Sequence, residues 1–440
     1  MNLKFYSLKK YFYKLLSNYC LFFSRNASNI GELEPKNDYL LYTMKHKQGK
    51  KKDVNINRIE QKKSIEKDYY DLIISNGNVH YDDDIQATFD ELHEKVKPET
   101  RVVVCFYNAM WRPLIQLVNF LRISDSGKET HWVSPNDIKN FATLSDFEIV
   151  SKQKRILMPV FIPVLSYIFN KILAPLPVFE WFTLVNLVVL RPVNKKIPLG
   201  NSPSVSVVVA ARNEAGNIEN IVKRVPEMGQ NDELIIVEGN SSDNTWQEMQ
   251  RVKEAYHDHN IIISQQKGKG KGDAVRQGFD MASKDILMIL DADLTVPPED
   301  LPKFYRAIIK NKGEFINGSR LVYSMENQAM RFANIIGNKF FALAFSFVLN
   351  QSLKDTLCGT KVISRKNYKE IAANRHYFGD FDPFGDFDLI FGAAKLGLKI
   401  VELPIKYRAR TYGDTNIQRW KHGMILFRML LFASRKIKFI

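Results

Sequence analysis

The sequence predicts an α/β protein whose second half builds a parallel β-sheet. Between residues 204 and 290, four short β-branched runs alternate with helical stretches of about 10–15 residues, an order typical of parallel sheets. Charged side chains also gather where these runs end. Because the carboxyl ends of parallel strands form the ligand site of such sheets, the pattern predicts both a fold class and a functional edge.

The elements follow in a regular order along this half of the chain. Strands are expected at 204–209, 233–237, 261–264 and 285–290, and apolar residues recur at helical spacing after the first three. A further apolar strand ends at Arg320, and an almost wholly apolar helix is expected at 338–350. That helix is too short to span a bilayer, so it is expected to be buried or to face a membrane. Glu214, Glu238, Lys271, Asp291 and Asp293 all fall at the strand ends.

Asp291, Ala292 and Asp293 close the fourth strand of this pattern. Magnesium and manganese take oxygen ligands and share them with substrate phosphates, so one or two aspartates at a strand end can hold either cation. A solvated turn before a helix that opens near Pro297 is the alternative interpretation. The other charged strand ends favour a divalent cation and a nucleotide diphosphate at this edge.

Seven motifs in this order resemble the family 2 glycosyltransferases of the GT-A fold, in particular those that transfer sugars to dolichol or polyprenyl phosphates. The resemblance covers about 203–416. The motifs are VVVAARNEAGNI (207–218), VEGNSSDNT (237–245), GKGKGDAVRQGF (268–279), LDADLTVPPEDL (290–301), INGSR (316–320), DTLCGTKVISR (355–365) and GDFDLIFGAAKLGLKIVELPIKYRARTYGDTN (385–416).

The resemblance implies roles at the donor side. Glu214 and Glu238 match positions that face the nucleoside, Asp291 a position near the ribose and phosphates, and Asp293 the metal ligand. The matching motifs place Ala210, Arg212, Lys271 and Ala292 among the nucleotide-binding residues. Three departures stand out: Glu238-Gly239 where relatives carry two acids, Ala210 to Arg212 where mannosyltransferases carry Pro-Thr-Tyr, and Thr295 where they often carry Gln.

The distal motifs imply an acceptor side and a lid. Arg320 and Arg331 match arginines on the donor or acceptor phosphate, and guanidinium groups suit bidentate phosphate binding. Asp386 and Asp388 match the acidic segment that faces the acceptor, where a carboxylate can act as general base. Arg408 and Arg410 match a mobile basic lid over the diphosphate. The open alternatives are a surface charge for Arg331, helix capping for one of the two acids, and a plain basic loop.

The region before residue 198 is a different unit. Strands at 70–75 and 101–106, a helix at 84–96, a helix opened by Ser134 and closing strands at 147–150 and 182–190 resemble the second half of a class I S-adenosylmethionine-dependent methyltransferase. The glycine-rich turn and ribose-binding acid of the first half are not found in residues 1–66, which are expected to be a basic, poorly ordered leader. Residues 67–197 are therefore expected to lack cofactor binding and methyltransferase activity.

Composition agrees with two units and with an anionic environment. The chain has 440 residues, 45% of them hydrophobic, and a formal charge of +15. Residues 417–440 are expected to form a basic amphipathic helix that lies on an anionic membrane surface, with packing on the catalytic domain as the alternative. Aromatic-basic interleaving typical of nucleic-acid modules is absent, so nucleic acid is not expected as a partner. Three cysteines at unrelated spacings predict a reducing cytosol.

Together these observations predict domains at 1–66, 67–197, 198–416 and 417–440. The expected function is transfer of a sugar from a nucleotide sugar to a polyprenyl phosphate or another membrane-proximal acceptor, in cell-surface glycan synthesis at the inner face of the membrane. The alternative is a non-catalytic assembly protein built from two degenerate halves. Sugar, base, acceptor and any homo-oligomer stay open.

Overall fold

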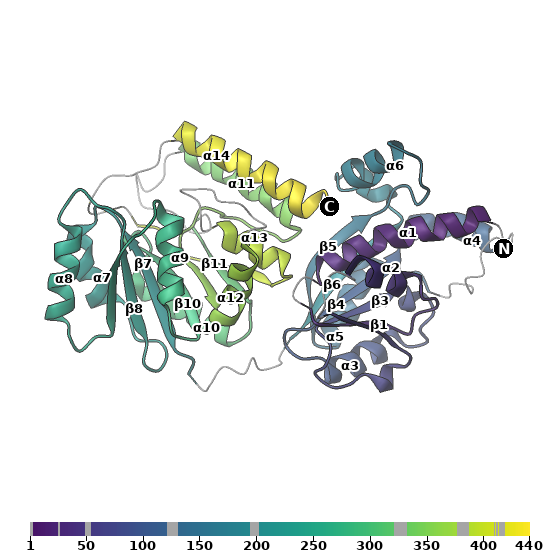
Figure 1. Cartoon of the computed structure of the whole chain (residues 1–440), viewed down its shortest axis with the longest axis horizontal. Coiled ribbons are helices and arrows are strands. Elements are labelled where there is room, and N and C mark those ends of the chain that lie inside the picture. The colour runs from purple at the N-terminus through teal and green to yellow at the C-terminus, as the bar shows by residue number, and fades with distance from the viewer. Residues whose placement is uncertain are drawn as a thin grey trace. The chain divides into compact units, whose positions relative to one another are not determined.

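Figure 1 shows the computed structural model of the chain, which divides into two compact units. The structure describes residues 3–24, 27–48, 54–120, 131–193, 202–320, 332–375, 387–408, 410, 412 and 419–440. The first unit holds residues 1–195, 395–397 and 435–440, and the second holds 196–394 and 398–434. The division of the chain near residue 195 therefore lies close to the boundary that the sequence predicts.

The second unit is built on a seven-stranded sheet with the order β13-β11-β12-β10-β7-β8-β9. The four strands expected between 204 and 290 are confirmed, and they pair in parallel. The strands are β7 (Val205–Ala211), β8 (Glu233–Glu238), β9 (Ile261–Gln265), β10 (Ile286–Asp291), β11 (Phe315–Ser319), β12 (Lys361–Ser364) and β13 (Ile400–Pro404).

A strand that the sequence did not predict, β12, runs antiparallel between β10 and β11. The chain reaches β12 after passing the carboxyl end of β11, where the backbone N–H of Gly318 donates to the carbonyl of Thr360. A strand that enters the sheet at this edge has to run back toward the other edge. The turn that precedes β12 thereby lies beside the carboxyl end of β10.

Helices cover both faces of this sheet. The central strands β7, β8 and β10 are buried on both sides, which explains their largely apolar sequences. Gly278 lies so close to Val208 that a Cβ atom there would come within 2.3 Å of the valine side chain, which brings α9 against β7. The helices are α7 (Ala215–Arg224), α8 (Thr245–Ala255), α9 (Lys271–Met281), α10 (Leu301–Ile309), α11 (Phe332–Leu349), α12 (Arg365–Ala373), α13 (Phe387–Lys395) and α14 (Arg419–Ala433).

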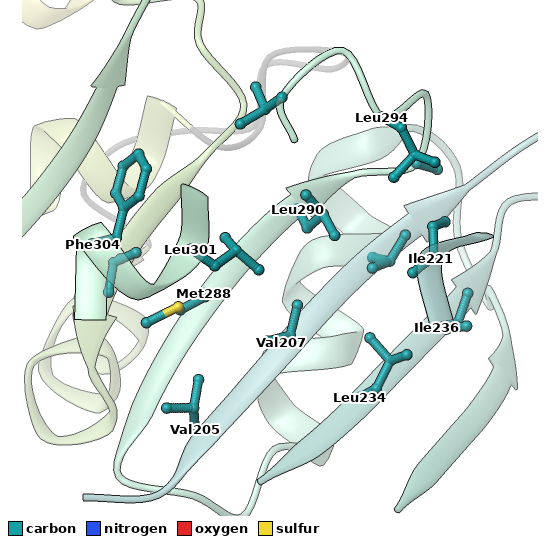
Figure 2. Close-up of a cluster of buried hydrophobic side chains, with 14 of the residues drawn as sticks. Val205, Val207, Ile221, Leu234, Ile236, Met288, Leu290, Leu294, Leu301 and Phe304 are labelled. Carbon is teal, nitrogen blue, oxygen red and sulfur yellow. The ribbon is translucent and has the colours of Figure 1, made fainter. Parts of the chain in front are cut away.

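One hydrophobic cluster fixes the strands relative to α7 and α10. In Figure 2, Val207, Met288 and Leu290 project from neighbouring strands toward the same face, where Ile221 and Leu301 meet them. All of these side chains are at most 2% exposed. Because a packed interior tolerates little displacement, this cluster holds the carboxyl ends of β7, β8 and β10 in a fixed relation.

The first unit is built on a mixed six-stranded sheet with the order β2-β1-β3-β4-β6-β5. β1, β2, β3 and β4 pair in parallel, whereas β6 runs antiparallel to both β4 and β5. The strands are β1 (Asn29–Leu33), β2 (Asn55–Ile59), β3 (Leu72–Asn76), β4 (Arg101–Tyr107), β5 (Phe147–Arg155) and β6 (Val185–Pro192).

The expectation of a poorly ordered leader over 1–66 is wrong for the described residues of that segment. β1 and β2 extend the sheet of the first unit beside β3, and β1 has Ile30 and Leu33 fully buried. Both strands are short and contain asparagine, glycine or charged residues, so their local pattern is weak. Their burial is decided by strand pairing over a long separation in sequence.

The helices of the first unit include the expected helix after Ser134, which a capping box between Ser134 and Asp137 begins. The expected helix at 84–96 is also confirmed, with Asp84 capping its first turn. No described helix is both long and apolar enough to cross a membrane. The α-helices are α1 (Leu3–Phe22), α2 (Tyr39–Gln48), α3 (Ile85–Lys95), α4 (Arg112–Phe120), α5 (Pro135–Leu144) and α6 (Leu165–Tyr167).

Candidate active site

The carboxyl ends of β7, β8 and β10 bring the expected donor-side residues to one edge of the second unit. Asp291 is in register with Ala210 on β7, and Ala211 is in register with Glu238 on β8. These pairings place Asp291 and Glu238, two acids from different motifs, on the two strands that flank the end of β7. The convergence expected from the strand order is therefore confirmed.

Asp291 is surrounded by positively charged side chains and by the backbone at Gly359. Its carboxylate forms an ion pair with Lys271, with Nζ 2.5 Å from Oδ1. A Cβ atom at Gly359 would lie 2.1 Å from Oδ2, so only glycine allows the chain to pass here. Burial acts to raise the pKa of Asp291, but the charges of Lys271, Lys361 and Arg320 outweigh it and lower that pKa. Asp291 is thus held in its ionised form.

Asp293 divides its two carboxylate oxygens between the chain and a cation. Oδ1 accepts hydrogen bonds from the backbone N–H and the hydroxyl of Thr295, at 3.1 and 2.8 Å. Oδ2 lies 2.7 Å from Nη2 of Arg410. Thr295 therefore orients the carboxylate of Asp293, and the second oxygen is presented to a positive group.

Glu214 begins α7 and shares the same arginine. Its Oε1 lies 3.3 Å from Nη1 of Arg410, and its Oε2 accepts a hydrogen bond from Asn217 at 2.7 Å. Burial raises the pKa of Glu214 despite these two favourable contacts. Arg410 thus joins Glu214 and Asp293, which stand 196 and 117 residues away from it in sequence.

The carboxylate of Glu238 serves the loop that follows β8. Its Oε1 accepts a hydrogen bond from the backbone N–H of Ser241, and the side chain is 3% exposed. Asp243 accepts hydrogen bonds from the backbone N–H groups of Thr245 and Ala215, at 3.0 and 3.4 Å. These acids therefore shape the edge of the site, and the resemblance-based role of Glu238 at the nucleoside stays a prediction.

The glycine-rich turn before α9 is organised by an acid on the helix. Oδ2 of Asp273 accepts hydrogen bonds from the backbone N–H of Gly268 and from Gln266, at 3.1 and 2.9 Å. Gly270 has φ 85°, a left-handed value that favours glycine. The turn delivers Lys271, the first residue of α9, to Asp291.

Arg320 forms a buried, bidentate ion pair with Asp355. Nε and Nη2 donate to the two carboxylate oxygens at 2.7 and 2.8 Å, and Asn338 of α11 donates to Oδ1 at 2.9 Å. Burial acts to raise the pKa of Asp355, but Arg320 outweighs it and lowers that pKa. Two nitrogens of the Arg320 guanidinium are therefore engaged by Asp355, and the expected phosphate-binding role would have to use its other N–H groups.

The expected lid residues reach the same edge. The backbone N–H of Arg408 donates to the carbonyl of Thr295 at 2.9 Å. The ring of Tyr412 lies against Gly216 in the first turn of α7, where a Cβ atom would come within 2.6 Å of it. Arg408, Arg410 and Tyr412 therefore lie at the ends of β7 and β10 rather than forming an isolated basic loop.

Other expected site residues are distributed less closely. Arg212 is exposed, and Ala292 is buried beside its two aspartates. Asp388, in the first turn of α13, is 7% exposed and lies 3.3 Å from Nε of Arg375. Arg331 and Asp386 lie outside the described residues, so their expected roles stay predictions.

Sequence reasoning named no role for two charged residues near the strand ends. Asp355 holds Arg320, and Lys361 is fully buried on β12, where its charge helps to lower the pKa of Asp291. Both lie in the DTLCGTK segment, which the sequence marked as a motif. The sequence signal that could have indicated their roles is a charged residue on each side of the Cys358-Gly359 pair.

The fit of a divalent cation can be judged from the two aspartates. Within the described ranges no group of three or more His, Cys, Asp or Glu side chains is arranged to hold a metal. Asp291 and Asp293 nevertheless each present one oxygen to a positive group. A pair of carboxylates suits a magnesium or manganese ion that takes its other ligands from a diphosphate and water.

Residues 206–372 match the family model described as glycosyl transferase family 2. The chain is 28% identical to the dolichol-phosphate mannosyltransferase of Pyrococcus furiosus over 240 residues, which cover 53% of this chain and 64% of that protein. It is 24% identical to the undecaprenyl-phosphate 4-deoxy-4-formamido-L-arabinose transferase of Photorhabdus laumondii over 230 residues, which cover 51% and 66%. The chain thus spans just under two thirds of the length of these relatives.

Among solved structures, glucosyl-3-phosphoglycerate synthase from Mycobacterium tuberculosis, in complex with Mn²⁺, uridine diphosphate and glucosyl-3-phosphoglycerate, aligns with 16% identity and a TM-score of 0.40. The alignment covers 55% of this chain and 83% of that one. The family match spans β7 to α12, and it contains Asp291, Asp293 and the residues that orient them. Residues 206–372 of the second unit are therefore similar to the glycosyl transferase family 2 proteins.

Proposed function

We propose that the second unit is a GT-A glycosyltransferase that transfers a sugar from a nucleotide-sugar donor to a polyprenyl phosphate. The observation that carries this proposal is the meeting of Glu214, Asp291 and Asp293 with Lys271 and Arg410 at one sheet edge of a family 2 domain. The similarity to a dolichol-phosphate mannosyltransferase and an undecaprenyl-phosphate 4-deoxy-4-formamido-L-arabinose transferase supports the acceptor class.

In this proposal the donor diphosphate replaces the carboxylates that Lys271 and Arg410 contact in the structure. Lys271 and Arg410 are cations held against carboxylates, and diphosphate oxygens can accept their N–H groups instead. Asp293, with Asp291, would hold a magnesium or manganese ion. When bound, the ion neutralises charge that develops on the departing nucleoside diphosphate.

The acceptor side needs less chemistry if the acceptor is a phosphate. An ionised phosphate oxygen is already a nucleophile, so it requires no strong general base. Asp386 and Asp388 remain the candidates for a base, and Arg320 and Arg331 for the acceptor charge. The fixed geometry of Arg320 on Asp355 supports a phosphate-binding role, because its orientation costs no further side-chain entropy.

We further propose that α11 and α14 place this unit on the membrane that carries the acceptor. The two helices lie side by side in Figure 1, and α14 buries Leu426 and Met429 while Phe427 and Leu431 stay exposed. The C-terminal helix thus both packs and exposes an apolar side, which supports an interfacial position. Phe427→Ser should weaken sedimentation with anionic vesicles without removing a buried side chain, unlike deletion of the helix.

The decisive experiment is a thermal-shift panel of nucleotide sugars with and without manganese. A ligand present at 100 times its Kd stabilises the folded state by about 2.7 kcal/mol, which is readily measured. One donor should stabilise the chain only with manganese, and it should support transfer of labelled sugar to a short-chain polyprenyl phosphate.

Asp293→Asn should abolish manganese-dependent binding of the nucleoside diphosphate in calorimetric titrations, because it removes the charge that faces the cation. The melting temperature should change little, since the side chain supports no core. Asp258→Asn, at an exposed position in the loop after α8, serves as the matched control. If no nucleotide sugar binds, or if Asp293→Asn binds as tightly as the native chain, the non-catalytic assembly role replaces the transferase.

A further inference from the structure

Exposed apolar side chains gather in two segments of the first unit that the transferase domain does not include. The segments are 109–120, which contains α4, and 156–182, which contains α6. Eight large apolar side chains in them are more than half exposed: Met110, Leu117, Phe120, Phe161, Val164, Tyr167, Val178 and Trp181. Contiguous apolar exposure on this scale marks an interaction site rather than ordinary surface.

Hydrogen bonds join the two segments into one surface. The indole N–H of Trp111 donates to the carbonyl of Phe182 at 3.0 Å, and Asn108 donates to the carbonyl of Trp181 at 2.9 Å. The ring of Tyr11, on α1, lies 5.3 Å from the ring of Phe161. The region formed by 109–120, 156–182 and the facing side of α1 is called the apolar surface below, and α1, α4 and α6 can be followed in Figure 1.

Positive charges outnumber negative charges at and around the apolar surface. Its two segments contain one acid, Glu180, whose carboxylate lies 3.3 Å from Nζ of Lys438. Lys154 and Lys171 stand over the rings of Trp181 and Tyr167, with Nζ 5.3 and 5.4 Å from the ring centres. The 20 residues of α1 contain four lysines and no acid. Negative charge is therefore the complement of this region.

The backbone presents one apolar residue outward under strain. Val164 has φ 66° and ψ −54°, and the backbone N–H of Leu165 donates to the carbonyl of Pro163 at 2.7 Å, which closes a three-residue turn. A β-branched residue in this conformation costs on the order of 1–3 kcal/mol. Exposure of this valine to water gives no favourable free energy that offsets the strain. Burial of its side chain in an apolar medium does give such a free energy.

We propose that the apolar surface of the first unit inserts into the interface of an anionic lipid bilayer. Trp and Tyr rings flanked by lysines are typical of the headgroup level of membranes, whereas protein–protein interfaces are depleted in lysine. Apolar insertion and attraction to anionic headgroups act together in such a surface. The inference concerns a unit outside the transferase domain and does not depend on sugar transfer.

The test is sedimentation of the full chain with vesicles that contain no polyprenyl phosphate and no nucleotide sugar. Vesicles of phosphatidylethanolamine and phosphatidylglycerol should bind at least tenfold more protein than vesicles of phosphatidylcholine alone. The triple variant Val164→Ser, Val178→Ser, Trp181→Ser should lose at least tenfold in partition coefficient, because these three side chains are 69–72% exposed and support no core. Leu144→Ser on α5, at 64% exposure, is the matched control and should bind as the native chain does.

A second readout locates the surface in the bilayer directly. Brominated acyl chains should quench the fluorescence of Trp181, seen as a loss of quenching in Trp181→Phe relative to the native chain, with Trp246→Phe in the second unit as the comparison. Equal vesicle binding by the native chain and the triple variant would overturn the proposal. So would a triple variant that turns a dimer into a monomer in sedimentation velocity while vesicle binding persists, since the surface would then cover a second copy.

Discussion

At the scale of single residues, both aspartates of the Asp-Ala-Asp turn are already neutralised by cations of the chain. Lys271 pairs with Asp291 and Arg410 pairs with Asp293. A carboxylate brought to a strand end by folding would otherwise repel its neighbour, so the two cations stabilise the site without a ligand. Any divalent ion that binds Asp293 through the same oxygen has to displace Arg410.

This competition predicts the effect of Arg410→Gln on metal binding. Manganese without nucleotide should bind the variant about three- to tenfold more tightly than the native chain, because a partly exposed ion pair contributes about 1 kcal/mol. Electron paramagnetic resonance of free Mn²⁺ measures this affinity. Arg408→Gln is the control, since the structure uses the backbone N–H of Arg408 at this edge. Equal Mn²⁺ affinities of the native chain and Arg410→Gln would show that the guanidinium does not compete with the ion for Asp293.

Glu32 predicts a pH dependence of stability in the first unit. Burial raises its pKa to about 7, despite a hydrogen bond from Asn76. The native state then keeps a proton that the unfolded chain releases near its ordinary value, so the stability contributed by Glu32 is present below that value and is lost as pH rises toward 7. Glu32→Gln should therefore stabilise the unit at pH 8 by about 2–3 kcal/mol, with little effect near pH 4.

Hydrogen exchange of the β1 and β3 amides at several pH values measures this difference where it arises. Glu60→Gln is the matched control, because Glu60 is an exposed partner of Arg58. A pH-independent gain, or none at pH 8, would show that burial does not raise the pKa of Glu32 in the native state.

At the scale of elements, the carboxyl edge of the first unit is filled by its own side chains. Asn78 donates to the carbonyl of Leu33 at 2.9 Å, and the backbone N–H of Lys62 donates to Glu34 at 3.0 Å. Nζ of Lys62 lies 2.8 Å from Asp82. Groups that would meet a ligand beyond β1 are thus paired with one another.

The first unit is therefore predicted not to bind S-adenosylmethionine, and no methyltransferase activity is expected. The physical reason is that side chains beyond β1 and β3 bind one another, which leaves their polar groups paired within the chain. Calorimetric titration of the full chain with the methyl donor should show no saturable heat. A stoichiometric binding curve would contradict the prediction.

At the scale of the whole molecule, the end of the chain belongs to the first unit. Residues 435–440 are part of it, and Ile437 and Lys438 are buried there. The fully buried Arg155 donates from Nη1 to the carbonyl of Lys438 at 2.7 Å. Residues 435–440 thus contribute buried groups to the first unit.

Truncation after Ser434 should destabilise the first unit by about 3 kcal/mol or more. It removes a buried isoleucine and leaves a buried guanidinium short of one acceptor. Faster hydrogen exchange in β5 and β6, with exchange in β7 and β10 unchanged, is the expected result. Removal of Phe439 and Ile440 alone is the control. Unchanged hydrogen-exchange protection of the β5 amides in the longer truncation would show that residues 435–440 do not stabilise the first unit.

The sequence by itself determined the strands and helices whose pattern is strong and local. The runs at 204–209, 233–237 and 285–290 are short and rich in Val, Ile and Leu, and they became β7, β8 and β10 at nearly those limits. Since parallel strands present their carboxyl ends at one edge, the same pattern placed Glu214, Asp291 and Asp293 together. The capped helix after Ser134 was predictable for the same local reason.

Only the tertiary structure decided what depends on pairing over long separations. β1 and β2 carry weak local patterns and are strands because β3 pairs with β1 and β1 with β2. The contacts of Arg410 with Asp293, and of Arg320 with Asp355, join residues 117 and 35 positions apart. A charged residue has many partners of opposite sign in sequence, and the fold selects one by bringing two groups within hydrogen-bonding distance and excluding water from the rest.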